Sequence, residues 1–221
     1  MFQRRIAAVA AYLPERVVTN HELVTSYGLP HSADWLHETT GVAERRFAGA
    51  AETTLSMAAA VLRELIEVGR LRDPFVDVLI MTTDDGGGGD AGEAAFAACM
   101  AGLVPALTID LTPAQGGFSA AVELANRHLD RGCRRVLIVA SDVRSRRLRA
   151  GQPWGNHQIS EILGDGATGV LLERVDGLGA EVPPRCAEAP PRCAEAPPRC
   201  AEAPPPRSSR PSRAAAHANR G

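Results

Sequence analysis

Apolar and polar positions follow two different periods along residues 1–182, and the two periods alternate. Nearly continuous apolar runs of strand length cover residues 6–13, 76–81, 106–111 and 135–140, and residues 164–173 give a glycine turn and another apolar strand. Segments between them place apolar residues at helical spacing, as Leu55, Ala58, Leu62 and Leu65 do. Strands that are apolar on both faces and alternate with helices predict an α/β fold in which helices cover both faces of one sheet.

Capping residues set the expected ends of the helices. The helices span residues 20–28, 32–41, 53–69 and 91–102, with Asn20, Ser32 and Thr53 or Thr54 as N-caps and Gly28, Gly41 and Gly69 near their ends. The stretch DDGGGGD at 84–90 predicts a mobile loop. Residues 144–162 begin with an Arg-rich cluster and have no clear period, so we expect them to leave the sheet.

The strand at 106–111 leads through a turn into an amphipathic helix, and we expect this corner to organise the chain. Gln115 lies at the turn, and Gly116 and Gly117 relax it. The unpaired N–H groups and the dipole at a helix N-terminus favour an anion or a thiolate, so a nucleophile here would be activated. Gln115, however, is not a nucleophile.

The C-terminal segment has a different composition. Residues 183–221 hold 10 of the 16 Pro residues, and PPRCAEA occurs three times in tandem, at 183–189, 190–196 and 197–203. Such a tract cannot build a hydrophobic core. We therefore predict one folded domain over 1–182 and a disordered, low-complexity tail over 183–221.

Charge and cysteine content narrow the function classes. All 24 basic residues are Arg, and the segment 1–182 has 17 Arg against 23 acidic residues, which argues against nucleic-acid binding. This segment holds only Cys99 and Cys133, so no disulfide framework is indicated and a cytoplasmic location is expected. Pro14 interrupts the apolar run at the N-terminus, which favours a buried strand over a signal peptide or a membrane span.

Several other features have simple structural explanations. The glycine clusters match neither G-x-G-x-x-G nor a Walker A loop, so turns explain them better than a nucleotide site does. A nucleotide-binding α/β domain is retained only as a third class. The tail cysteines recur every seven residues, a spacing that does not suit zinc, and no metal site is expected. His157 fits a solvated loop, whereas Trp35 is equally compatible with a core position and with a ring-stacking platform.

Six separate blocks resemble β-ketoacyl-acyl carrier protein synthase III, a family with the thiolase fold. They are AYLPERVVTN at 11–20, SADWLHETTGVAERR at 32–46, residues 77–83, DLTPAQGGF at 110–118, RVLIVASDV at 135–143 and LGDGATGVLLE at 163–173. From the first block to the last they span residues 11–173, in the family's order. The resemblance implies a thiolase-like α/β fold, and specifically the N-terminal half of that duplicated fold, with a mixed sheet covered by helices.

The resemblance also implies acyl transfer followed by decarboxylative condensation, in fatty acid or polyketide biosynthesis. Family members load an acyl group from coenzyme A onto a Cys at a helix N-terminus, in a D-x-x-x-A-C-x-G-F motif. Asp110, Ala114, Gly117 and Phe118 match this motif, whereas Gln115 occupies the nucleophile position. Glutamine forms no thioester, so acyl loading at this position is excluded. In related ketosynthases a Gln here is taken to mimic the acylated enzyme and to leave decarboxylation without condensation.

Other family positions are altered or missing. Trp35 matches the adenine-stacking Trp of the coenzyme A site, while Thr39 and His157 stand where the best-known members have Arg. The catalytic His and Asn lie in the second half of the fold, and the HAN at 217–219 lacks their flanking pattern. The glycines at 86–89 lack the bulky residue that helps to shape the partner subunit's acyl pocket.

These features predict an acyltransferase-type homologue that is truncated and inactive in condensation as a lone chain. The alternative is a malonyl-thioester decarboxylase or a non-catalytic protein that binds acyl carrier protein. The resemblance implies coenzyme A thioesters as substrates and no tightly bound cofactor. The expected binding partners are acyl carrier protein and either a second copy of the chain or a partner ketosynthase. Neither nucleic acid nor a membrane is expected as a partner. A frameshift or repeat expansion would explain the tail, and a lone half would expose apolar surface that a second half buries.

Overall fold

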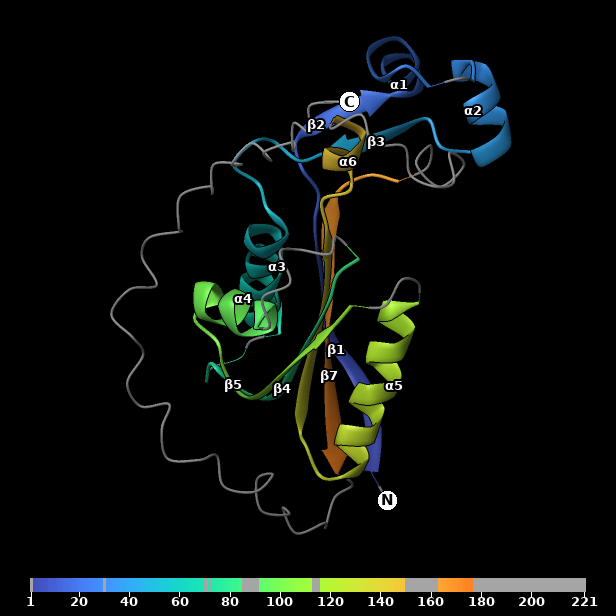
Figure 1. The fold of residues 1–221 in the computed structure, drawn as a ribbon. Helices are drawn as coiled ribbons and strands as arrows, with labels where there is room; N and C mark the ends of the chain where they lie inside the picture. The colour runs from blue at the N-terminus through green and yellow to red at the C-terminus, as the bar shows by residue number, and fades with distance from the viewer. Residues whose placement is uncertain are drawn as a thin grey trace, which may run out of the picture. The chain divides into compact units, whose positions relative to one another are not determined.

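The computed structural model describes residues 2–29, 31–69, 71, 73–84, 92–112, 116–149 and 163–176. Its elements, in chain order, are β1 (Phe2–Tyr12), β2 (Arg16–Thr19), α1 (Asn20–Tyr27), α2 (Ala33–Thr40), β3 (Glu44–Phe47), α3 (Thr54–Val68), β4 (Phe75–Thr82), α4 (Glu93–Ala101), β5 (Val104–Leu111), α5 (Gly117–Asp130), β6 (Arg135–Asp142), α6 (Ser145–Arg149) and β7 (Gly166–Asp176) (Figure 1). The tail expected at 183–221 lies outside the described residues, as do Gln115, His157 and most of the loop at 84–90.

The main sheet has five strands in the order β1-β7-β6-β4-β5. Strand β4 is parallel to both β5 and β6, whereas β7 is antiparallel to β6 and to β1. The sheet is therefore mixed, as the resemblance implied. Because β4, β5 and β6 run in the same direction, their carboxyl ends lie at one edge of the sheet, where α/β proteins usually bind ligands. The N-terminal end of β7 lies at this edge too, since Gly166 pairs with Asp142.

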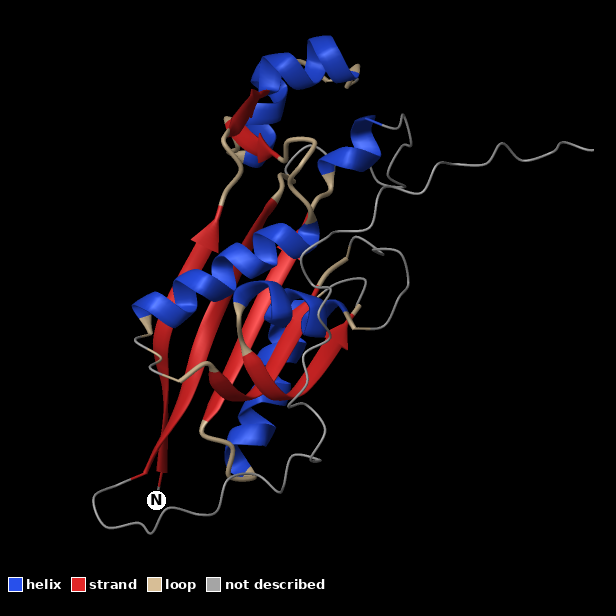
Figure 2. Ribbon diagram, turned by 90° about the vertical axis from the view of Figure 1, so that its left-hand side faces the viewer, coloured by secondary structure: helices blue, strands red, loops and turns tan. Residues whose placement is uncertain are grey.

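Helices cover both faces of the sheet, which confirms the interpretation of two-sided apolar strands for the central strands β4, β6 and β7. The prediction of a buried strand at the N-terminus was wrong, because β1 is an edge strand on which Ile6 and Val9 are exposed, and the other edge strand, β5, is also largely exposed. Helices α3 and α4 pack on one face, where Leu62 and Leu65 meet Leu79, Leu137 and Leu171. Figure 2 views the sheet from this side. Helix α5 packs on the other face, and its buried side chains Ala121, Ala125 and Leu129 contact Val78, Ile80, Val136, Ile138 and Val170. Alternate residues of each central strand thus point to different helices, as the two-residue period of a strand requires.

A second, smaller sheet was not predicted. Strands β2 and β3 form an antiparallel pair, and with α1 they surround a cluster of Val18, Leu23 and Phe47. Each strand has only four residues, too few for the alternation of polar and apolar positions to stand out from a loop. The short helix α6 at Ser145–Arg149 was not predicted either.

The expected caps are mostly confirmed. Ser32 caps α2, and Thr53 caps α3 in a reciprocal capping box with Ser56. The prediction for α1 was wrong by one residue, because Thr19 accepts the hydrogen bond from the N–H of Glu22. Asn20 instead turns inward, donates to the carbonyl of Val42 at 2.8 Å and accepts from the buried guanidinium of Arg45 at 2.7 Å.

Strands β1 and β7 are longer than the apolar runs suggested. β1 begins at Phe2, and β7 ends at Asp176, because polar residues at these ends continue the antiparallel ladder to the pair Phe2–Asp176. Arg5 and Glu173 face each other in this ladder and form an ion pair at 2.7 Å. Among the described residues, no helix is both long and apolar enough to cross a membrane.

Candidate active site

Helix α5 begins directly after a glycine in the left-handed conformation. Gly116 is the N-cap of α5 with φ +75°, and its carbonyl accepts the hydrogen bond from the N–H of Ala120 at 3.0 Å. No side chain caps this end of α5 within the described residues. The first N–H groups of the helix therefore lack a side-chain acceptor, and they favour a negatively charged group nearby. Gln115 directly precedes Gly116 in the sequence but lies outside the described residues.

Asp110, a residue of the matched motif, holds the strand that leads into this corner. Its carboxylate accepts hydrogen bonds from the N–H of Gly92 at 3.0 Å and from the N–H of Ala94 at 2.7 Å. Helix α4 has Gly92 as its N-cap and no side-chain cap of its own. Asp110 thus supplies the cap from a neighbouring strand, and its charge also favours the positive end of the α4 dipole.

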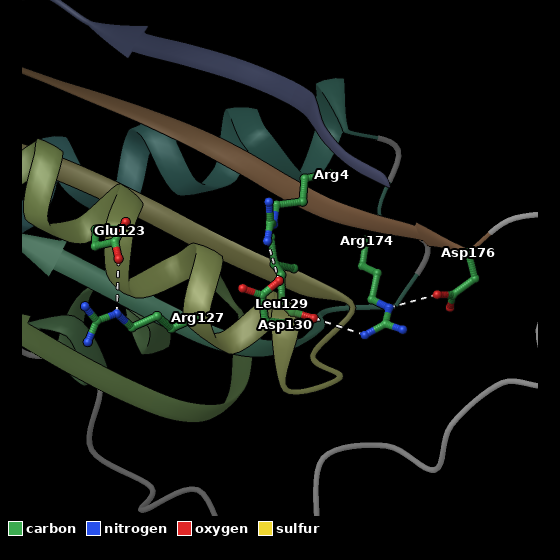
Figure 3. Close-up of polar contacts among 7 residues, drawn as sticks. All are labelled: Arg4, Glu123, Arg127, Leu129, Asp130, Arg174 and Asp176. Carbon is green, nitrogen blue, oxygen red and sulfur yellow. Dashed lines mark hydrogen bonds and ion pairs between the residues drawn. The ribbon is translucent and has the colours of Figure 1, made fainter. Parts of the chain in front are cut away.

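Arginine side chains hold the opposite end of α5 (Figure 3). Arg174 donates to the carbonyl of Leu129 in the last turn at 3.1 Å and to the carboxylate of Asp176 at 2.8 Å. Arg4 forms an ion pair with Asp130, the last residue of the helix. A cation close to the terminal carbonyls of a helix is favourable, so these contacts fix α5 to β7 and β1.

A charged cluster lies at the carboxyl edge of the sheet. Arg144 forms an ion pair with Asp84, and its Nε lies 4.0 Å from the carboxylate of Asp142. Asp142 in turn accepts from the hydroxyl of Thr83 at 3.0 Å and from the N–H of Asp84 at 2.7 Å. Arg144, the first residue of the Arg-rich segment 144–149, thus forms its ion pairs within the fold. Arg146 contributes a second internal contact, because it donates to the carbonyl of Glu52 at 2.6 Å.

A buried carboxylate joins the smaller sheet to the main one at this edge. Asp165, only 3% exposed, accepts from the N–H of Ala48 at 2.6 Å and from the N–H of Ser145 at 2.8 Å. The N–H of Asp165 donates to the carbonyl of Arg46 at 2.8 Å. Sequence reasoning assigned the GDGATG stretch to a glycine turn and did not single out Asp165. An Asp between two glycines at a strand start was the available signal.

A concave site of about 720 Å³ lies beside this junction. Its lining includes Leu13, Arg46, Ser141, Asp142, Arg144 and Thr168. Gly164 permits the close approach of β3, because a Cβ there would lie 3.0 Å from the carbonyl oxygen of Arg46. Burial lowers the pKa of Arg45, which also lines the site, and its hydrogen bond to Asn20 is therefore made by a desolvated cation.

Two of the expected coenzyme A positions lie on α2. Trp35 is half-buried and Thr39, one turn later, is exposed. Because residues four apart in a helix share a face, Trp35 and Thr39 lie on one side of α2. Strand β3 follows α2 in the chain, and the residue after it, Ala48, donates to Asp165 at the carboxyl edge of the sheet, the edge at which α5 begins. It does not bring Trp35 or Thr39 together with Gln115 or His157, since the latter two lie outside the described residues.

The mixed sheet, its two helical layers and the glycine-capped helix at the carboxyl edge define a thiolase-type α/β fold. Residues 109–183 match the protein family described as "3-oxoacyl-[acyl-carrier-protein (ACP)] synthase III". The chain is 33% identical over 173 residues to the β-ketoacyl-[acyl-carrier-protein] synthase III of Acidiphilium cryptum, covering 78% of this chain and 52% of the relative. It is 32% identical over 170 residues to that of Streptococcus suis, with 76% and 50% covered.

Solved structures agree with the sequence comparison. The 3-oxoacyl-(acyl carrier protein) synthase III of Pseudomonas aeruginosa superposes with a TM-score of 0.67 at 26% identity, over 81% of this chain and 52% of that chain. A priming β-ketosynthase of a polyketide biosynthetic pathway gives 0.67 at 25% identity, over 79% and 51%. The chain is thus similar in sequence and fold to members of the 3-oxoacyl-[acyl-carrier-protein] synthase III family. It spans about half the length of the curated relatives it matches.

Proposed function

We propose that this chain is a 3-oxoacyl synthase III homologue that binds coenzyme A thioesters and acyl carrier protein in the cytoplasm without forming an acyl-enzyme at position 115. The observation that carries the proposal is the identity of Gln115 immediately before Gly116, the N-cap of α5. An amide can accept and donate hydrogen bonds, but it offers no thiolate to attack a thioester. The architecture of the nucleophile corner is thus combined with a side chain that cannot carry the acyl group.

The described contacts on both sides of the corner support an intact binding architecture. Asp110 secures the strand before it, and Arg174 secures the far end of the helix after it. Trp35 and Thr39, together with His157, are the residues that we propose to contact coenzyme A. No residue of the segment 1–182 is assigned to the family's second-half His and Asn. We propose a second copy of this chain or a partner ketosynthase as a further binding partner.

Intact-mass spectrometry after incubation with acetyl-coenzyme A tests the proposal. The wild-type chain is expected to gain no covalent acetyl group, whereas Gln115→Cys gains one that hydroxylamine removes. Gln115→Ala is the matched control, because it also removes the amide but adds no thiol. An acetylated wild-type chain would contradict the assignment of Gln115. Failure of acetyl-coenzyme A to bind the wild-type chain would contradict the thioester-binding function itself.

The second candidate is a malonyl-thioester decarboxylase, and the same Gln115 favours it. A side-chain amide beside a helix N-terminus can imitate the carbonyl of an acylated Cys, leaving the site in the state that receives malonyl thioester. Release of labelled carbon dioxide from malonyl-coenzyme A, with no condensation product, would establish this activity. Retention of acyl carrier protein on a column of the immobilised chain, with no carbon dioxide released, would instead favour a non-catalytic partner.

A further inference from the structure

The indole of Trp35 is in an unusual setting for a large aromatic residue. It is half-buried, yet it belongs to none of the three apolar clusters that the described residues form. Its ring stacks on the imidazole of His31, with 3.8 Å between the centroids and 23° between the planes. The residue that anchors α2 to the rest of the fold is Leu36, which is fully buried. Trp35 is therefore not needed as the core contact of its helix.

Local backbone geometry produces the stack. Ser32 has an extended conformation, with φ −74° and ψ 158°, and its hydroxyl accepts from the N–H of Trp35 at 3.2 Å. This cap turns the chain at the start of α2, so His31, which precedes the cap, lies against the residue three positions inside the helix. The imidazole thus covers one face of the indole.

We propose that His31 is a positioning residue for ligand binding, bracing Trp35 so that the opposite face of the indole stacks on the purine ring of a coenzyme A thioester. The inference rests on the thioester-binding function proposed above and adds a residue to it. Aromatic rings pair most favourably when their mutual orientation is fixed, and each such pair contributes beyond its buried area. A ring already held by His31 loses less conformational freedom when the ligand binds.

The charges on α2 support recognition by stacking. Asp34 and Glu38 are exposed acidic residues on this helix, and Thr39 offers a short hydroxyl at the next turn. These groups do not attract the phosphates of a nucleotide. The ring system is then the part of α2 that suits the nucleotide, and its contribution to binding depends little on salt because stacking involves no pair of opposite charges.

Isothermal titration of the full chain with coenzyme A and with pantetheine, which lacks the nucleotide, tests the inference. His31→Ala is expected to weaken coenzyme A binding about three- to tenfold, the range of one aromatic pair, and to leave pantetheine binding unchanged. His31→Phe preserves the stack and restores coenzyme A affinity. His37→Ala is the matched control, because His37 is exposed on the same helix.

Each other outcome has a defined meaning. Equal coenzyme A affinity in wild type and in folded His31→Ala overturns the role of His31. An equal loss of both ligands, or a loss that His31→Phe does not restore, assigns His31 to helix stability alone and also overturns it. If the wild type binds pantetheine and not coenzyme A, only the stacking inference fails. If it binds neither ligand, the thioester-binding function fails and the role of His31 fails with it.

Discussion

The carboxylate of Asp165 accepts a hydrogen bond from the backbone N–H of Ala48 at 2.6 Å, although 117 positions separate the two residues in the sequence. Through its second oxygen the same carboxylate accepts from the N–H of Ser145 at 2.8 Å. One buried side chain therefore joins the segment after β3, the start of α6 and the start of β7. The segment joined in this way includes β3, which follows α2 in the chain.

Asp165→Ala is expected to destabilise the fold by about 2–5 kcal/mol, because it leaves the N–H groups of Ala48 and Ser145 without their acceptor. Urea unfolding followed by circular dichroism measures the change. Asp130→Ala is the control, since Asp130 is 48% exposed and forms only a surface ion pair worth about 1 kcal/mol or less. Similar midpoints for the two variants would contradict the role of Asp165.

Asp110→Ala is expected to cost about 0.5–2 kcal/mol, the usual value of a lost helix cap. The effect should be local, so amide hydrogen exchange should accelerate at Ala94 and its neighbours in α4 more than in α3. Glu123→Ala removes an exposed carboxylate on α5 and serves as the comparison. Unchanged exchange in α4 would show that the cap contributes nothing.

Two glycines should respond to alanine for different reasons. Gly116→Ala places a side chain at φ +75° with no heavy atom within 4 Å, so strain alone should cost about 1 kcal/mol. Gly169→Ala places a Cβ 2.8 Å from Val61 and 3.0 Å from the carbonyl oxygen of Ile138, so the core must shift at about 1–3 kcal/mol. Chemical denaturation of both variants checks the order, and a Gly116 variant that is less stable than the Gly169 variant would reverse it.

The pair Tyr12–Glu52 should make stability depend on pH. The Tyr12 hydroxyl donates to Glu52 at 2.6 Å, which lowers the pKa of Glu52 from 4.5 and raises the pKa of Tyr12 from 10.0. A lowered carboxyl pKa gives stability that is present above pH 4.5 and is lost as the pH falls through the folded-state value. A raised Tyr pKa gives stability that is present below pH 10 and is lost as the pH rises through the folded-state value.

Tyr12→Phe should therefore make the melting temperature depend less on pH at both ends of the pH range. It should also lower the melting temperature slightly near neutrality. Thermal melts from below pH 4.5 to above pH 10 measure the profile. Tyr27→Phe, which alters the other tyrosine, is the control. An unchanged profile in Tyr12→Phe would contradict the coupling.

The α5 face of the sheet carries exposed apolar residues on β1. Ile6 and Val9 are 65% and 60% exposed, and they pair with Leu172 and Val170, whose side chains belong to the α5 cluster. Val9→Thr should therefore reduce self-association in sizing chromatography without loss of stability. Val170→Thr, at a buried position, should destabilise instead. Greater self-association in Val9→Thr would contradict this interpretation.

Local signals predicted local features well. Ser32 and Thr53 act as caps because a cap depends on residues three positions away. The strands around Leu79 and Ile138 were predictable from runs of apolar residues. Asn20 was assigned to a cap because its type suits that role, but its burial beside Arg45 depends on a strand 25 positions later. Thr19, whose hydroxyl oxygen can also accept a hydrogen bond, is the N-cap of α1.

Long-range features required the structure. The roles of Asp165 and Arg174 depend on partners far away in the sequence, and no periodic pattern carries that information. Trp35 lies outside the three apolar clusters of the described residues, which argues against a core position, and its role as a ring-stacking platform stays a prediction. The function of the corner came from the resemblance and not from periodicity, because a glycine turn before a helix is common to many folds.

Helix α5 is held by its buried face and by Arg4 and Arg174 at its last turn. The two arginine contacts lie at the end of α5 that is farthest from residue 115 in the sequence. Exchanging the side chain at 115 should therefore change the reactivity of the corner while the helix stays in place. The helix and the reactive side chain are thus separable. A variant that gains activity at position 115 is expected to keep the surrounding structure unchanged.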